Sequence, residues 1–429
     1  MLIKNARLID PLDDTEEICH ILIENGVVEQ IIKGSDFTYS GEEIDASGLI
    51  TAPGLVDVHT HFRDPGQTEK ETLHTGAAAA AAGGYTSVVC MANTSPAVDN
   101  TKTLKDVLER AASEKIHIYQ TATVTKGRSG RELTDMPGLI TAGAAGFTDD
   151  GTAITDEALV RTAMQDAAQL GAVLSFHEED PAFVKEAGIN KGRISDAMGI
   201  YGADRKAEYS LVERDIKIAL ETGARIDIQH VSAKESVEII REYKAKDRNE
   251  LIHAEATPHH FSLTDDAIIR YGSNAKVNPP LRTDEDRIAV IEGIRDETLD
   301  IIATDHAPHT SEEKSGELIK APSGMVGLET ALSLAITNLV APGYITLPEL
   351  VKRMSYNPAK LYGLNAGRIE AGAPADIVIF DPENTWTVSE EMLHSRSKNS
   401  PFIGTTLKGR VIYTVSNGII VYSKDGQEI

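Results

Sequence analysis

Cysteine is scarce in this chain of 429 residues, which contains Cys19 and Cys90 and no others. Two cysteines cannot build a disulfide framework, so a reducing compartment is expected. Long apolar runs are also missing, since none approaches the roughly 20 residues that span a bilayer. The first residues lack the charged start and apolar core of a signal peptide. We therefore expect a cytoplasmic protein with no membrane partner.

Positive charge is in short supply as well. The 42 Lys and Arg residues are outnumbered by 66 Asp and Glu, and the formal net charge is -24. A surface this acidic repels phosphate backbones, so no nucleic acid partner is expected. The share of hydrophobic residues, 41%, is ordinary for a globular protein. At this length, a large domain accompanied by a smaller one is expected.

Both ends of the chain have the composition of β-strands. Residues 2–9 and 21–28 are strand-like and flank the hairpin-type turn Glu24-Asn25-Gly26, and residues 375–381 and 418–422 are strand-like too. Neither end could bury an apolar face alone. We therefore predict that residues 1–51 and 366–429 together form one small β-sandwich domain.

The middle of the chain alternates apolar, β-branched runs with helical stretches, which is typical of parallel strands joined by crossover helices. This pattern predicts an α/β fold in which residues 52–365 form a (β/α)8 TIM barrel, the catalytic domain. The predicted strands cover residues 54–60, 86–91, 116–123, 145–148, 172–177, 226–230, 251–256 and 299–305.

Residues that bind metals occur where these strands end, which is the catalytic rim of such a barrel. His59 and His61 close the first strand, and because side chains alternate along a strand, both point the same way. Later strands end in His177, in His230, in Asp305 and in the pair Asp149–Asp150. Any one of these histidines could simply be a hydrogen-bonded core residue. Together they predict a centre for a divalent metal such as zinc.

These residues, in this order, resemble the metal-dependent amidohydrolase superfamily. Residues 372–378 resemble the segment by which the chain of that superfamily returns into its β-sandwich. The finer resemblance is to the bacterial class I dihydroorotases and covers nearly the whole chain. The motifs that carry it are residues 56–66, 91–94, 257–260, 276–282, 305–309 and 404–409.

The resemblance implies two zinc ions, with a single ion as the alternative. It implies that His59, His61 and Asp305 hold one ion and that His177 and His230 hold the other. Most of the superfamily bridges its metals with a carbamylated lysine after the fourth strand, but no lysine lies between residues 142 and 151. The class I enzymes use an aspartate there, so we predict Asp150 as the bridge, with Asp149 as the alternative.

The resemblance also implies a reaction. It is the reversible, zinc-dependent cyclisation of N-carbamoyl-L-aspartate to L-dihydroorotate with loss of water, a step of de novo pyrimidine (UMP) biosynthesis. In the hydrolytic direction, water attacks a ring amide activated by the metal. Asp305 is the expected catalytic residue: it takes a proton from the water and returns it to the leaving nitrogen.

A carboxylate on the substrate requires fixed donors. Arg63 follows the histidine pair in the same phase and is predicted to bind it, the alternative being an ion pair with Asp64 or Glu69. The other predicted substrate contacts rest on the resemblance: Asn93, Asn278, His309, Pro322 and Gly324. Residues 310–323 are predicted to form a lid. Family members read Pro-Phe-Gly at its end, whereas Ser323 stands here, so an aromatic wall against the ring is in doubt.

Two rival functions stay open. One is another cyclic amidohydrolase, such as a hydantoinase or an allantoinase. Arg63 argues against a hydantoinase, whose substrates carry no carboxylate, and the missing lysine argues against both. The other rival is a dihydroorotase-like subunit that scaffolds aspartate transcarbamoylase, although such subunits lose metal ligands that this chain retains. We expect a homodimer, with association with that transcarbamoylase left open.

Overall fold

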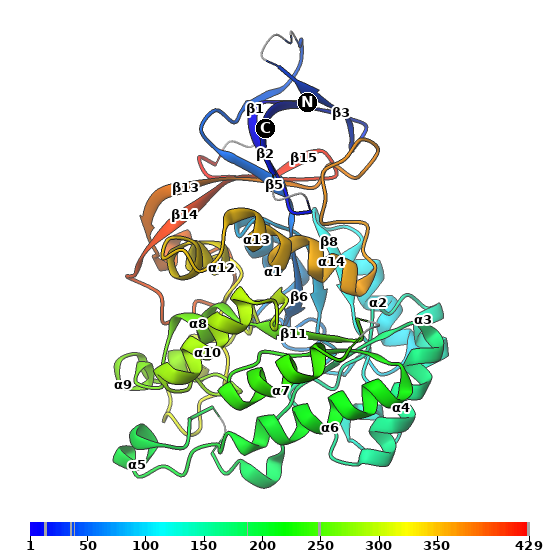
Figure 1. The fold of residues 1–429 in the computed structure, drawn as a ribbon, viewed down its shortest axis with the longest axis vertical. Helices are drawn as coiled ribbons and strands as arrows, with labels where there is room; N and C mark the ends of the chain where they lie inside the picture. The colour runs from blue at the N-terminus through cyan, green and yellow to red at the C-terminus, as the bar shows by residue number, and fades with distance from the viewer. Residues whose placement is uncertain (13–14, 35–36, 38, 187, 248–249, 427–429) are drawn as a thin grey trace.

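The computed structural model describes residues 1–429 except 13–14, 35–36, 38, 187, 248–249 and 427–429. Figure 1 shows a β-rich part at one end of the molecule, which contains both chain termini, and a larger part of strands and helices beneath it. The coarse α/β class predicted from the sequence is confirmed.

The β-rich part is built from strands at both ends of the chain. They are β1 (Leu2–Asp10), β2 (Thr15–Glu24), β3 (Val27–Lys33), β4 (Glu43–Asp45), β5 (Ile50–Pro53), β13 (Ile377–Thr387), β14 (Thr406–Ser416) and β15 (Ile419–Ser423). They form one eight-stranded sheet in the order β15-β14-β13-β5-β1-β2-β3, with β4 paired to β1. The predicted sandwich is thus a single hydrogen-bonded sheet, because β5 pairs with both β1 and β13.

This sheet curls back on itself. The edge strand β3 exchanges backbone hydrogen bonds with the segment before β13: Val28 N donates to the Ala373 carbonyl at 2.9 Å, and Gly372 N donates to the Val28 carbonyl at 2.8 Å. A separate hydrophobic cluster, which includes Ile21 and Ile377, is buried against it. The two ends of the chain therefore share one core, as expected for segments that cannot bury an apolar face alone.

The larger part contains two parallel sheets. One consists of β6 (Leu55–Thr60), β7 (Tyr85–Cys90) and β8 (His117–Gln120). The other consists of β9 (Val173–Phe176), β10 (Arg225–Ile228), β11 (Ile252–Ala256) and β12 (Ile301–Ile302). Between the sheets, Phe147 forms bridges to Ala122 and Leu174, and Thr60 forms a bridge to His306. The strand predicted at residues 145–148 is therefore present as a single-residue bridge.

Helices follow the strands along the chain. The longer ones are α1 (Leu73–Ala82), α2 (Thr101–Ala111), α4 (Glu157–Leu170), α6 (Lys206–Thr222), α7 (Lys234–Lys244) and α10 (Asp284–Arg295). The shorter ones are α3 (Met136–Thr141), α5 (Arg193–Met198), α8 (Pro258–Ser262), α9 (Ala267–Tyr271), α11 (Ser311–Lys314), α12 (Ala331–Ala335), α13 (Leu347–Val351) and α14 (Asn357–Tyr362). Among the described residues, none of these helices combines the length and the apolar character that crossing a bilayer requires.

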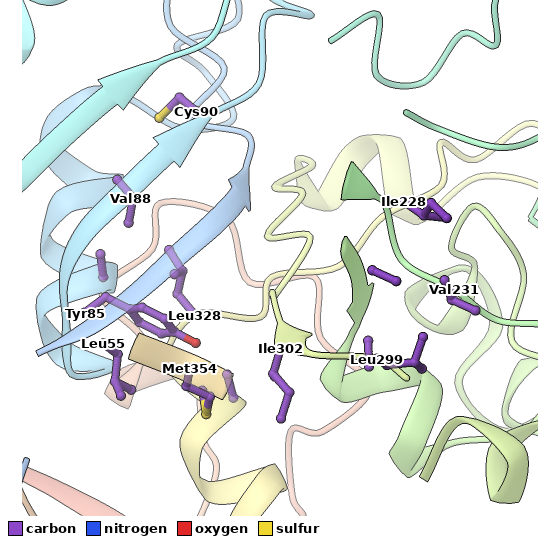
Figure 2. Close-up of a cluster of buried hydrophobic side chains, with 14 of the residues drawn as sticks. Leu55, Tyr85, Val88, Cys90, Ile228, Val231, Leu299, Ile302, Leu328 and Met354 are labelled. Carbon is purple, nitrogen blue, oxygen red and sulfur yellow. The ribbon is translucent and has the colours of Figure 1, made fainter. Parts of the chain in front are cut away.

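The core lies between the parallel strands and the helices around them. Figure 2 shows Leu55 of β6 and Tyr85 of β7 packed near Leu328 and Met354, with Ile302 of β12 alongside. Helix α1 fits closely because it consists mostly of alanine. This packing holds the strands in position, and the candidate metal-binding residues lie at the strand ends.

Candidate metal centre and substrate cavity

The six predicted metal-ligating residues lie together at the C-terminal ends of the parallel strands. They come from β6 and the residue after it, from the turn after Phe147, and from the segments following β9, β10 and β12. All are nearly or completely buried. Two overlapping groups have the spacing of a metal site: His59, His61 and Asp150 in the first, and Asp150, His177 and His230 in the second.

Asp150 lies between the histidines. Its Oδ1 is 3.5 Å from His59 Nε2 and 3.7 Å from His177 Nδ1, and its Oδ2 is 3.6 Å from His61 Nε2. Asp149 points elsewhere: its Oδ1 accepts a hydrogen bond from Thr125 N at 3.0 Å. The geometry therefore favours Asp150 as the shared residue and gives Asp149 a structural role.

Asp305 completes this cluster. Its Oδ1 is 3.0 Å from His61 Nε2 and 3.5 Å from His59 Nε2. Burial by itself would raise the pKa of the Asp305 carboxyl, but the charges of His59 and His61 and the His61 hydrogen bond hold that pKa below its ordinary value. The same opposition, in which the nearby His59 imidazole contributes most and the charges of His61 and His177 add to it, holds the pKa of Asp150 well below its ordinary value. Both carboxylates are therefore anionic.

The cluster fits a divalent cation. His59 Nε2 is buried and has no hydrogen-bond partner, although it lies between the two carboxylates. Burial, together with the neighbouring His177 and His59, holds the pKa of His230 well below its ordinary value, which leaves this imidazole neutral. Imidazole nitrogens and carboxylate oxygens that converge in this way are the donor set of zinc sites, where the metal ion takes the place of the imidazole protons.

Three residues of the site have left-handed backbone conformations. Arg63 has φ 59°, His230 has φ 35° and Asp305 has φ 48°. Positive φ is uncommon for residues other than glycine and carries a conformational cost. Its occurrence at three strand ends of one site indicates that the surrounding contacts impose these backbone turns and aim the side chains.

A cavity of about 230 Å³ opens onto the cluster. His59 lies beneath it and is fully buried. The lining residues are His61, Arg63, Asn93, Asp150, Gly151, His177, His230, Asn278, Asp305, Ala307, His309, Ser323 and Gly324. Of the predicted substrate contacts, Pro322 alone is not in this lining, and its carbonyl accepts a hydrogen bond from Lys314 Nζ at 2.8 Å.

Arg63 is part of the cavity wall and is 9% exposed. Its Nε donates to the Pro308 carbonyl at 3.2 Å, and its Nη2 lies 3.4 Å from His309 Nε2. Asp64 pairs instead with Arg110 at 2.6 Å. Among the described residues, Arg63 forms an ion pair with neither Asp64 nor Glu69, the predicted alternatives, and its guanidinium is held against the cavity by its neighbours.

The two predicted asparagine contacts are already engaged within the protein. Asn93 Oδ1 is 3.0 Å from His61 Nδ1, and Asn93 Nδ2 donates to Asp150 Oδ2 at 2.8 Å. Asn278 Oδ1 accepts from Gly188 N at 3.0 Å, and its Nδ2 donates to Glu179. Asn93 thus orients residues of the metal cluster, a role that the sequence did not predict.

His309 is held by a residue that the sequence reasoning missed. Asn399, from the C-terminal segment, accepts from His309 N at 3.0 Å and donates to the carbonyls of Ala307 and Gly324, both at 3.1 Å. Burial, followed by the charges of Arg63 and Lys314, lowers the pKa of His309 to about 3, so the ring is neutral. Nothing near Asn399 in the sequence signals this contact.

Two buried lysines hold the predicted lid in place through hydrogen bonds to backbone carbonyls. Lys276 Nζ donates to the carbonyls of Leu318, Ile319 and Ala321 at 2.7–3.0 Å. Lys314 Nζ donates to the Ser273 carbonyl at 2.9 Å as well as to Pro322. The segment therefore packs against residues 273–276 beside the cavity.

A model of the amidohydrolase family matches residues 50–421. The dihydroorotase of Clostridioides difficile is 51% identical over 423 residues, which cover 99% of this chain and 100% of the relative. The dihydroorotase of Clostridium acetobutylicum is 50% identical over 422 residues, which cover 98% and 99% of the two chains. The chain belongs to the amidohydrolase family, among the dihydroorotases.

Solved structures of a hydantoinase and a dihydropyrimidinase resemble the fold of this dihydroorotase-family chain. The L-hydantoinase from Arthrobacter aurescens has a TM-score of 0.89 at 26% identity, and the match covers 99% of this chain and 96% of that one. The dihydropyrimidinase from Brevibacillus agri has a TM-score of 0.85 at 25% identity, covering 98% and 95%. The fold is thus shared with hydantoinases, whereas sequence identity is about twice as high to the dihydroorotases.

Proposed function

We propose that the chain catalyses the dihydroorotase reaction, the reversible cyclisation of N-carbamoyl-L-aspartate to L-dihydroorotate in pyrimidine biosynthesis. The observation that carries this proposal is the meeting of two kinds of group in one cavity. A His and Asp cluster suited to a divalent metal lies beside Arg63, a fixed cation suited to a carboxylate. The names of the full-length relatives support the same reaction.

Zinc is the metal we propose, with two ions per chain. His59, His61 and Asp305 would hold one ion, His177 and His230 the other, and Asp150 would contact both. The two overlapping groups of candidate ligands support this count. When bound, such ions supply Lewis acidity to an amide carbonyl and lower the pKa of water.

The remaining chemistry belongs to side chains of this protein. Arg63 binds the carboxylate of the substrate and sets the position of its ring, and the neutral His309 lines the same cavity with its Nε2 3.4 Å from the guanidinium Nη2. Asp305 is anionic and lines the cavity. We assign to the Asp305 carboxylate the proton that leaves the attacking water and then moves to the departing nitrogen.

The finer architecture belongs to the same proposal. Residues 52–365 would form a closed (β/α)8 barrel, which the bridges at Phe147 and between Thr60 and His306 support. Residues 1–51 and 366–429 would form the small β domain. We further propose a cytoplasmic homodimer, a location in line with two free, buried cysteines. A pull-down with aspartate transcarbamoylase tests whether the chain binds that enzyme.

Metal analysis followed by substrate assays tests the proposed function. We expect about two zinc ions per chain and turnover of dihydroorotate, with a hydantoin turned over far more slowly. Hydrolysis of the hydantoin without turnover of dihydroorotate would favour the hydantoinase alternative. A matched pair of variants tests the ligands: Asp150→Asn should lose bound zinc and activity, whereas Asp149→Asn should retain zinc because Asp149 contacts Thr125.

A further inference from the structure

Glu255 lies on β11 directly beneath the metal cluster and is completely buried. Its Oε2 is 2.8 Å from Nδ1 of His59, and the same oxygen accepts a hydrogen bond from the backbone N of His230 at 3.2 Å. One carboxylate oxygen therefore contacts a residue from each of the two candidate ligand groups.

The contact with His59 determines which ring nitrogen carries the proton. Nδ1 faces the Glu255 carboxylate, which can only accept a hydrogen bond, so Nδ1 is the donor. Nε2, which has no hydrogen-bond partner among the described residues, faces the space between Asp150 and Asp305, where a metal ion would take the place of its proton. A carboxylate behind a histidine in this way fixes the ring orientation and makes the ligand nitrogen more basic.

The contact with His230 supports a strained turn of the backbone. His230 has φ 35°, and its N–H is satisfied by the Glu255 side chain. The next residue, Val231, donates its N–H to the Glu255 carbonyl at 3.0 Å. Glu255 thus holds two successive amides, one through its side chain and one through its main chain, and this fixes where the His230 ring points.

We propose that Glu255 is a positioning residue for both halves of the metal centre: it sets the tautomer of His59 and holds the backbone turn that aims His230. This inference rests on the metal-dependent function proposed above. It predicts that the charge and the reach of the Glu255 side chain control metal affinity, although Glu255 is not itself a ligand.

Glu71 provides a matched control. It is as completely buried as Glu255, and its Oε2 is 3.3 Å from Nε2 of His306, a histidine outside the predicted ligand set. Changing it to Gln exchanges the same atoms as Glu255→Gln, oxygen for nitrogen, behind a histidine that holds no metal in the proposed centre. Glu71→Gln leaves the contact between His59 and Glu255 in place.

The test measures zinc affinity of the metal-free proteins by competition with a chromophoric chelator, beside their thermal unfolding. Loss of a carboxylate behind a ligating histidine typically weakens metal binding about 10–100-fold. We expect that loss for Glu255→Gln, a smaller loss for Glu255→Asp, which keeps the charge with a shorter reach, and an affinity within about 3-fold of the wild type for Glu71→Gln. The unfolding temperatures of the metal-free variants should stay close together.

Two results would overturn the inference. One is wild-type zinc affinity in both Glu255 variants, and the other is an equal loss of affinity in Glu71→Gln. If Glu255→Gln does not fold, the comparison of Glu255→Asp with Glu71→Gln decides the question. A chain that binds zinc in this Glu255-dependent way but does not turn over dihydroorotate would contradict the proposed reaction and leave the inference standing.

Discussion

Replacing Arg63 by alanine tests the proposed recognition of an acidic substrate. The Arg63 Nε is occupied by the Pro308 carbonyl. His309 Nε2 lies within 3.4 Å of Nη2 but donates its own hydrogen to the Ser323 carbonyl at 2.9 Å. Both terminal nitrogens of the guanidinium therefore keep donors for a ligand, in the planar fork that matches a carboxylate.

The expected loss follows from those donors. A hydrogen bond to a charged group contributes about 1.5–3 kcal/mol, and paired bonds are not additive. We therefore expect Arg63→Ala to lose about 3–4 kcal/mol of transition-state binding, which is a fall of roughly 100- to 1,000-fold in kcat/KM. Arg63→Lys should recover part of this, because an ammonium supplies charge without the fork.

The assay is steady-state hydrolysis of dihydroorotate, with bound zinc measured in every variant. Arg110→Ala is the matched control, since Arg110 pairs with Asp64 and Asp106 outside the cavity. It should keep kcat/KM near that of the wild type. Wild-type kcat/KM in Arg63→Ala would refute the carboxylate site while leaving the metal cluster untouched. A loss of zinc in that variant would show that Arg63 acts through the metal centre instead.

Three further predictions follow from buried groups around the site and beneath it. Asn399→Ala leaves three buried backbone partners without their bonds, so the free energy of unfolding should fall by about 2–4 kcal/mol in a denaturant titration, and an unchanged midpoint would contradict this. Lys276→Met should make residues 311–321 more susceptible to proteolysis and raise the KM for dihydroorotate. Lys320→Met, at an exposed position, should behave as the wild type in both assays. Burial would raise the pKa of Asp300, but the charge of Lys244 and the hydrogen bond from His253 outweigh burial and hold it below its ordinary value. Because the folded pKa lies below the unfolded value of about 3.9, this stabilisation is fully present above the unfolded pKa. It is lost as the pH falls from about 4 through the folded pKa. Thermal unfolding of Asp300→Asn should thus be less sensitive to pH below about 4, and an equal slope in both proteins would count against the argument.

The positions of the metal cluster could be predicted from local sequence because a strand has a simple period. His59 and His61 are two residues apart, so their side chains point to the same side of the strand. The parallel strands bring the remaining candidate ligands to the same edge of the sheet. The fourth strand was harder to predict. Around Gly146 the backbones approach so closely that an added Cβ would lie 3.0 Å from the Val173 carbonyl oxygen, and pairing there is reduced to Phe147. Apolar composition predicts such a strand, but its length depends on its neighbours.

What the sequence could not supply is the layer that holds the site in place, because those contacts join distant segments. Asn399 lies 90 residues beyond the His309 backbone that it binds, and Glu255 lies 196 residues beyond His59. Glu255 did carry a signal: it is an acid between Ala254 and Ala256 in an apolar strand, and a buried acid requires a partner. Composition identifies that requirement, whereas only the fold identifies the partner. The partner of an acid predicted inside a core strand of such a protein is therefore best sought among the ligand histidines at the ends of other strands.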